Sequence, residues 1–307
     1  MTQLLRNASR SFVLALLIGA LGCGSKQAAP SGPSIGERLA AAAREPKPEA
    51  RAAKLLAIGR DQALAFDKQG AVKTLKEARG AIDEVADPRG RTLLLISLAE
   101  AWHQAGDFGE PRKALGAAQA SLDKIADLEL RIEVGARLAV AQHSLGAASD
   151  ARQTITAAEK AAEGLADAEA RSRSLALLAR TARKFGALGG SDHLFAAAKD
   201  AAESIDNPRG KSRALLTLSG ELRTAGIAAS ATAALDDSLA AARKIDKDYT
   251  KVYALVEIAE RLAALGQGTE ARSALAEAAA AAKRVPEPDL RSEAEHKVEV
   301  LQRKLGS

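Results

Sequence analysis

The sequence is poor in the residues from which most reactive or cofactor-binding sites are built. Its 307 residues include one cysteine, one methionine, one tryptophan, two tyrosines and four histidines. A single cysteine excludes an internal disulfide, and the scattered histidines offer few of the three or four protein ligands that a zinc site needs. The glycines follow predicted helices instead of preceding them, which excludes a phosphate-binding loop. We therefore expect no enzyme activity, no cofactor and no metal site.

A long apolar run and a strong excess of one charge are also missing. The apolar stretch from Phe12 to Leu21 is too short to cross a hydrocarbon core, which needs roughly 20 residues. The formal net charge is +5, and it falls to +3 without the arginines of the leader, Arg6 and Arg10. This mild charge gives no reason to expect nucleic-acid binding.

The first residues resemble the export signal of bacterial lipoprotein precursors. A basic start and the apolar stretch lead to Ala20-Leu21-Gly22-Cys23, although that family usually has Leu at the position of Ala20. The resemblance implies a signal peptide over 1–22, a lipid on Cys23 and a flexible tether over 23–33. It places the protein in the bacterial cell envelope, with Gly24 favouring the periplasmic side of the outer membrane. A plain secretory signal and a retained N-terminal anchor are the alternatives.

The remainder of the chain repeats itself every 40 residues. Apolar residues recur in the columns Leu75, Leu115, Ile155, Phe195, Leu235, Leu275 and Ile58, Leu98, Leu138, Leu178, Leu218, Ile258. Glycine recurs at Gly106, Gly146, Gly186, Gly226 and Gly266. A fixed period of 20–50 residues is typical of a solenoid, in which each unit packs only on its neighbours.

Each unit contains the signals of two helices. Asp87-Pro88 can start the first helix, because Asp caps free N–H groups and Pro is tolerated at the first helical position. Gly106 can end that helix in the left-handed conformation. A second apolar stripe at helical spacing follows before Asp127 begins the next unit. No segment alternates in the manner of a strand.

These units resemble tetratricopeptide repeats. The resemblance rests on Leu95, Leu98-Ala99, Gly106, Pro111, Leu115 and Ala118 and on their counterparts in the other units. Phe66 departs from it by replacing the turn glycine of the first unit, and the period is 40 instead of 34. We expect an all-α solenoid of about fourteen helices with one continuous core. Six repeats would cover 48–287, between capping helices at 34–47 and 288–307. HEAT-type repeats are the alternative.

A basic residue occupies the first turn of each first helix. The column is Arg51, Arg91, Arg131, Arg171, Lys211, Lys251 and Arg291. Several members lie four residues after a capping Asp. We expect these side chains to pack between repeats and to pair with carboxylates, which is a structural role.

The resemblance also implies that the first helices line a concave surface that holds a partner. The candidate binding residues at concave positions are His103, His143, Arg173, Arg180, Arg183, Lys184, Arg213 and Arg223. Arginine can grip a carboxylate with two parallel hydrogen bonds, so this basic face predicts an acidic peptide segment or another envelope protein as partner. The two histidines occupy equivalent positions of neighbouring units, but no third metal ligand accompanies them.

The sequence therefore predicts a membrane-tethered scaffold for protein–protein interaction, with no catalytic residues. Two alternatives use the same fold. The basic face could hold an anionic envelope polymer or ligand, or the array could serve only as an architectural spacer. The sequence indicates neither the partner nor the oligomeric state.

Overall fold

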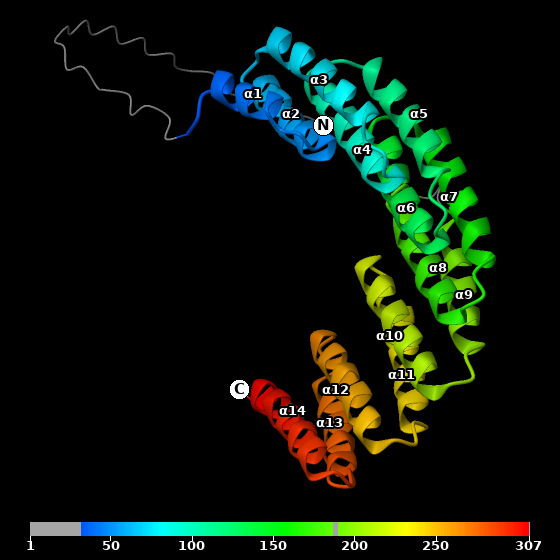
Figure 1. Ribbon diagram of the computed structural model, residues 1–307. Coiled ribbons are helices and arrows are strands. Elements are labelled where there is room, and N and C mark those ends of the chain that lie inside the picture. Colours follow the sequence, from blue (N-terminus) through cyan, green and yellow to red (C-terminus); the bar gives the residue numbers. More distant parts are fainter. Residues whose placement is uncertain (1–31, 187–189, 307) are drawn as a thin grey trace, which may run out of the picture.

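The computed structural model describes residues 32–186 and 190–306, and within them the regular structure is entirely helical. Helices stack along an open arc, with the first and last described helices at its tips (Figure 1). The helices of the first set are α2 (Pro48–Leu64), α4 (Pro88–Gln104), α6 (Leu128–Ser144), α8 (Ala168–Arg183), α10 (Pro208–Thr224), α12 (Asp248–Ala264) and α14 (Pro288–Gly306). Those of the second set are α1 (Ile35–Ala43), α3 (Lys68–Asp83), α5 (Glu110–Leu122), α7 (Ala148–Glu163), α9 (Ser191–Glu203), α11 (Ala228–Arg243) and α13 (Gly268–Ala282). The chain is thus an all-α solenoid, as expected.

The first-set helices begin at intervals of 40 residues, from Pro48 to Pro288. The predicted caps form at four of these starts. Side-chain oxygens of Asp87, Asp127 and Asp167 accept hydrogen bonds from backbone N–H groups three residues later, at 2.7, 3.0 and 3.2 Å. Asn207 accepts one from the N–H of Arg209, two residues later. Capping by a short polar side chain therefore helps to fix where these four units begin.

The turn between the two helices of a unit needs a left-handed residue. Glycine supplies it five times, with φ between 76° and 83° at Gly106, Gly146, Gly186, Gly226 and Gly266. Phe66 occupies the same conformation in the first unit, with φ 61°. A bulky side chain is strained there, because its Cβ approaches the neighbouring backbone. The first turn is therefore less favourable than the other five.

The first-set helices form the inner layer of the arc and the second-set helices the outer layer (Figure 1). Each inner helix packs against the next inner helix, whereas outer helices pack mainly on their own inner partner and on the following inner helix. No two outer helices make extensive contact in the described part of the chain. The inner layer is therefore the compressed, concave side.

The predicted core columns are buried, but the core is divided. Leu75 and Leu138 are fully buried, and so are their counterparts in most units. The buried apolar residues form three successive large clusters instead of the one continuous core that we expected. Buried polar pairs lie near the two divisions, Gln142 with Thr154 and Ser212 with Ser238.

The arginines of the basic column have structural partners, but these are only in part the carboxylates that we expected. Arg91 pairs with Asp83 at 3.0 Å, whereas Arg131 and Arg171 donate to the carbonyl oxygens of Ile125 and Leu165. The capping Asp side chains are already engaged by backbone N–H groups. Each arginine therefore ties its helix to the end of an adjacent outer helix.

The ends of the array carry shorter or more polar helices than its middle. The first helix spans Ile35–Ala43, which is shorter than the expected 34–47, and α14 buries only Ala294, Val298 and Leu301. None of the helices in 32–186 and 190–306 is long and apolar enough to cross a membrane. The proposed signal peptide, Cys23 and most of the tether lie outside the described residues.

Candidate functional site

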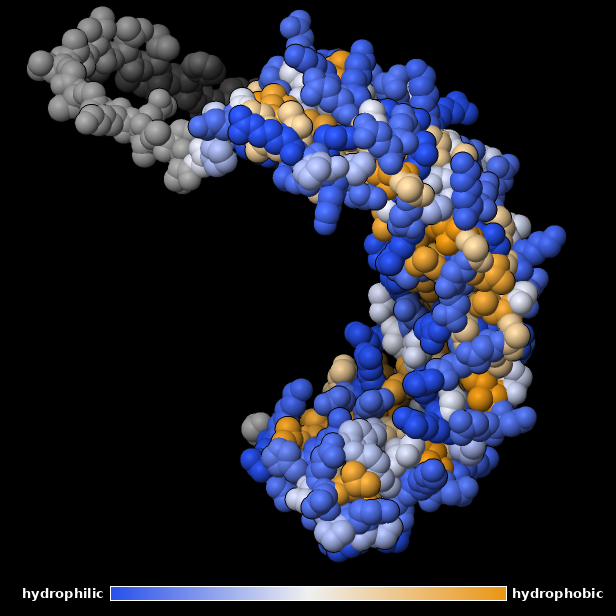
Figure 2. Space-filling model, in the orientation of Figure 1, coloured by the Kyte–Doolittle hydropathy of each residue, from blue (hydrophilic) through white to orange (hydrophobic). Residues whose placement is uncertain are grey.

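A groove of about 620 Å³ crosses the inner faces of α4, α6 and α8. Its apolar lining comes from Leu93, Ile96, Ala136, Val140 and Leu177. Polar side chains border this lining, and hydrophilic residues dominate the inner edge of the arc (Figure 2). An apolar strip with polar borders, running across three successive helices, has the shape to take an extended chain.

Most charged groups at this groove are already neutralised. Glu100 pairs with Arg60 of the preceding unit at 3.2 Å, and Glu133 pairs with Arg137 one helical turn away at 3.0 Å. Lys184, at the α8 border, is the one lining cation with no partner among the described residues. The groove therefore offers one free positive charge instead of a broad basic surface.

Arg180 borders the groove and forms an ion pair with Glu221 of α10. Both side chains are only 25% exposed, so the pair is partly shielded from water. A half-buried pair of this kind links neighbouring inner helices, and breaking it would leave a partly desolvated charge. Arg180 consequently acts first as a link between α8 and α10.

Arg173 and Arg213 belong to a ladder of ion pairs near the starts of α6, α8 and α10. Arg173 bonds both carboxylate oxygens of Glu129 at 3.0 and 3.1 Å. Arg213 bonds both oxygens of Glu169 at 2.5 and 2.6 Å, and this contact raises the pKa of Arg213. Each pair spans 44 residues, which is one repeat plus one helical turn. These arginines are thus engaged by carboxylates of the chain itself.

Arg183 and Arg223 lie at the ends of their helices, beyond the groove lining. Arg183 donates a 2.7 Å hydrogen bond to the carbonyl oxygen of Ala225, in the turn of the next unit. Arg223 is exposed and has no partner among the described residues. Of the six cations predicted to form a binding surface, Lys184 and Arg223 remain available.

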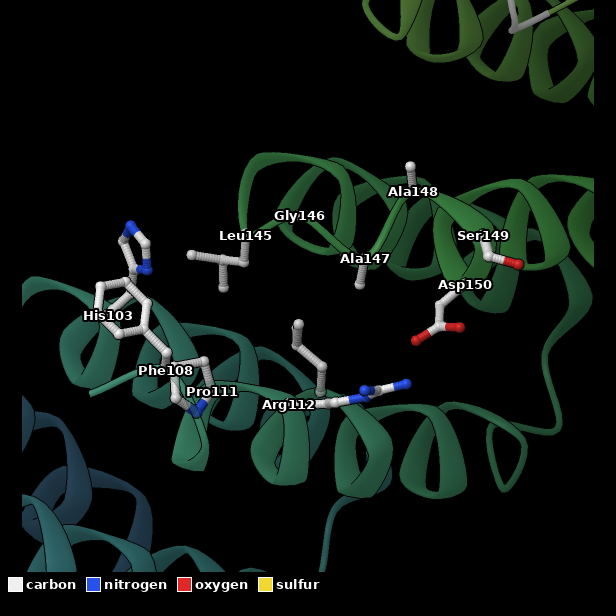
Figure 3. A pocket seen from close by; sticks show the side chains of 11 residues that line it. His103, Phe108, Pro111, Arg112, Leu145, Gly146, Ala147, Ala148, Ser149 and Asp150 are labelled. Atoms are coloured by element: carbon white, nitrogen blue, oxygen red, sulfur yellow. The ribbon is translucent and has the colours of Figure 1, made fainter. Parts of the chain in front are cut away.

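His103 and His143 are not among the residues that line the groove, although both belong to inner helices. They lie in the last turns of α4 and α6, where their rings pack on phenylalanines of the turn regions. His103 meets Phe108 edge-on at 5.6 Å, and His143 stacks on Phe185 at 4.6 Å. His103 and Phe108 border a separate hollow between α5 and the start of α7 (Figure 3). Both histidines follow groove-lining residues by one helical turn, toward the ends of their helices.

No group of three histidine, cysteine, aspartate or glutamate residues in 32–186 and 190–306 is placed to hold a metal ion. The strongest pKa shift belongs to a different region of the inner layer. Partial burial, together with hydrogen bonds to Glu293 and Tyr249, raises the pKa of Tyr253. Lys297 lies 4.4 Å from the centre of the Tyr253 ring. This cluster joins α12 to the terminal helix α14.

Sequence reasoning found the inner face but missed the apolar lining of the groove. Leu93, Val140 and Leu177 occupy columns whose other members are mostly polar or charged. Apolar residues at positions that are polar in the other units were therefore the sequence feature that could have predicted the groove. The ion-pair ladder also had a signal, because Glu129 with Arg173 and Glu169 with Arg213 share the same 44-residue offset.

Comparison with known proteins identifies no family. No protein-family model matches the chain, and no curated protein matches it. Among solved structures, BtubC (BKLC) from P. vanneervenii is similar at 15% identity and a TM-score of 0.37, over 68% of this chain and 91% of that one. Ton1535 from Thermococcus onnurineus NA1 is similar at 13% identity and a TM-score of 0.30, over 86% and 83%. A circular tandem repeat protein is similar at 13% identity and a TM-score of 0.32, over 88% and 74%.

Proposed function

We propose that this chain is a membrane-tethered lipoprotein of the bacterial cell envelope whose tetratricopeptide-like solenoid binds a protein partner on its concave face. The groove across α4, α6 and α8 carries this proposal. The lipid on Cys23 would hold the array near a membrane, with the outer membrane favoured. The protein would act without catalysis, by presenting a shaped surface.

The groove favours an extended peptide segment with one or two acidic residues. Apolar side chains of the peptide would cover Ala136, Val140 and Leu177, and a carboxylate would reach Lys184. A highly charged anionic polymer fits less well, because Arg173, Arg180 and Arg213 already pair with carboxylates of the chain. An apolar centre with a polar rim is the common plan of protein interfaces, and apolar anchors in a groove are a recurring mode of peptide recognition.

Crosslinking in cells, followed by capture from membranes, tests the proposal. The informative variant is the pair Lys184→Glu and Arg223→Glu, because neither residue has a partner in the described structure and no ion pair is broken. A second variant, Val140→Asp, places a charge on the apolar lining. The matched control is the pair Lys73→Glu and Lys76→Glu, an equal charge change at exposed positions of the outer helix α3.

Capture of one partner by the native protein and the control, with loss from the charge variant and from Val140→Asp, is the expected result. Equal capture by all four proteins would place the interface elsewhere and contradict the proposal. Loss from the charge variant alone, with an anionic polysaccharide captured in place of a protein, would favour the ligand alternative. Mass measurement of the mature N-terminus tests the tether, because a lipid on Cys23 adds acyl chains that a plain secreted protein lacks.

A further inference from the structure

The most exposed large apolar side chains of the described residues gather at one edge of the array. Phe66 is 95% exposed, Phe108 78% and Leu64 63%, and all three lie at the turns between inner and outer helices of the first two units. Ile35, at the start of α1, is 36% exposed. The other exposed large apolar residues, Leu290 and Val300, lie on α14, the last of the described helices.

The N-terminal tether reaches the body at this same edge. The start of α1 is fixed beside the end of α2, because Arg38 pairs with Asp61 at 2.6 Å. Ser34, which caps α1, therefore lies at the edge that carries Leu64 and Phe66. Figure 2 shows hydrophobic residues over α1 and α2, where the described chain begins.

Phe66 is unfavourable for the fold in two independent ways. It adopts the left-handed φ of 61° that five glycines supply in the other units, and it leaves its ring almost entirely in water. Strained residues that the surrounding fold does not require mark positions with another role. A bulky ring kept exposed at a turn is the arrangement by which a protein inserts an apolar side chain into a lipid surface.

We propose that Leu64, Phe66 and Phe108 dock this edge onto the lipid surface to which the chain is tethered. The inference rests on the proposed lipid at Cys23. Eleven peptide steps separate Cys23 from Ser34 and can span at most about 40 Å, which keeps the edge within reach of the headgroups. Tethering raises the local concentration, so a few apolar side chains suffice for contact. Docking would hold the array by one tip and leave the concave groove open.

Charges of both signs flank the edge, among them Lys68, Asp107 and Glu110. A hydrogen bond from the backbone N–H of Glu110 lowers the pKa of Asp107, so this carboxylate stays charged at neutral pH. Recognition therefore rests on apolar insertion and not on attraction to anionic lipid. Vesicles of zwitterionic phosphatidylcholine are accordingly the appropriate probe.

The test uses tryptophan fluorescence of the protein isolated from membranes and reconstituted into such vesicles. Phe66→Trp and Phe108→Trp place a reporter at the edge, and Val300→Trp is the control on α14 at the other tip of the arc (Figure 1). The native Trp102 is 3% exposed and supplies the same background in every variant. Lipids brominated on their acyl chains quench only an indole that enters the bilayer.

The expected result is loss of most of the added emission for Phe66→Trp and Phe108→Trp in brominated vesicles, with no loss for Val300→Trp. Quenching at the edge no greater than in the control overturns the inference. A blue shift without quenching does so as well, because the ring is then covered by protein, for example by a second copy. Mass measurement of the N-terminus separates the two proposals. A lipid on Cys23 without quenching at the edge would support the tether and contradict the docking. Quenching at the edge without a lipid would support contact with the bilayer and contradict the tether.

Discussion

The third unit (α6 and α7) and the fifth unit (α10 and α11) have the same pair of helices, but their buried polar pairs lie at opposite ends of those helices. In the third unit Gln142 and Thr154 are hydrogen bonded at 2.8 Å near the turn, where the fifth unit has Leu222 and Ala234. In the fifth unit Ser212 and Ser238 are hydrogen bonded at the other end, where the third has Ile132 and Ala158. In both units each of these buried polar side chains has a hydrogen-bond partner. The repeat therefore fixes the positions of the helices, whereas the buried polar residues vary from unit to unit in matched pairs.

The largest expected change in stability comes from placing glutamine, the residue at position 142 of the third unit, at the equivalent position 222 of the fifth. Leu222→Gln removes a buried leucine and leaves an amide facing Ala234, which cannot bond it. We expect a loss of about 2–4 kcal/mol in the free energy of unfolding, measured by urea denaturation. Amide hydrogen exchange should show the loss mainly in α10 and α11.

Adding Ala234→Thr should recover part of this loss by recreating the pair of the third unit. If the double variant is as unstable as Leu222→Gln alone, the two units are not interchangeable at this position.

Breaking the hydrogen bond between Thr154 and Gln142 in the third unit should cause the next largest loss of stability. Thr154→Ala leaves the buried Gln142 carbonyl oxygen without its donor, and we expect a loss of about 1–3 kcal/mol. Combining it with Gln142→Leu copies the fifth unit and should return the stability close to that of the native protein. An additive loss in the double variant would show that the polar pair is required where it is.

A substitution in the turn of the first unit should increase stability. Phe66→Gly replaces a strained left-handed residue by the one used in five equivalent turns, and we expect stabilisation of about 0.5–1 kcal/mol, the relief of strain being offset in part by the entropy of glycine. Thermal unfolding measures it. Gly146→Ala, which introduces strain into the third unit, is the matched opposite and should destabilise.

The smallest expected effect is a change in how stability depends on pH. Arg243 bonds Glu277 at 2.7 Å between α11 and α13 and lowers the pKa of that carboxyl, whereas the third unit and its neighbour have Glu163 and Ala197 at the equivalent positions. A lowered folded-state pKa stabilises the protein at pH values above the ordinary glutamate pKa of 4.5, and this contribution is lost as the pH falls through the folded value.

Glu277→Gln should therefore reduce stability slightly at pH 7 and make no difference at pH 2, since exposed pairs of this kind contribute about 0–1 kcal/mol. Urea midpoints at the two pH values measure the effect. A deficit that persists unchanged at pH 2 would assign it to packing and not to charge.

The repeat explains which features could be predicted from the sequence. Columns such as Leu138 and Gly146, supported by the cap at Asp127, report on helix position and burial, which depend on local spacing. Contacts between units depend on helix rotation and on side-chain reach. The prediction therefore placed Arg173 and Arg213 on an open basic face, although their carboxylate partners lie one repeat and one turn away.

The same limit applies to the candidate site. The inner face follows from the order of helices, but the groove depends on where Val140 and Leu177 interrupt polar columns and on how far along each helix the lining extends. His103 and His143 lie one turn after residues of that lining, where their rings pack on phenylalanines of the turn regions. Single-residue exceptions were thus more informative about the site than the residues that recur.

The uniform 40-residue spacing of the inner helices also bears on how the length of the array can change. Removal or duplication of one whole unit would join helix ends that already match, without a new loop and without shifting the phase of the helices that follow. The mismatch would fall on contacts that differ from unit to unit, such as Arg180 with Glu221 or Arg213 with Glu169. Variants of this chain with one unit more or fewer should therefore fold, with the span between their tips altered in discrete steps.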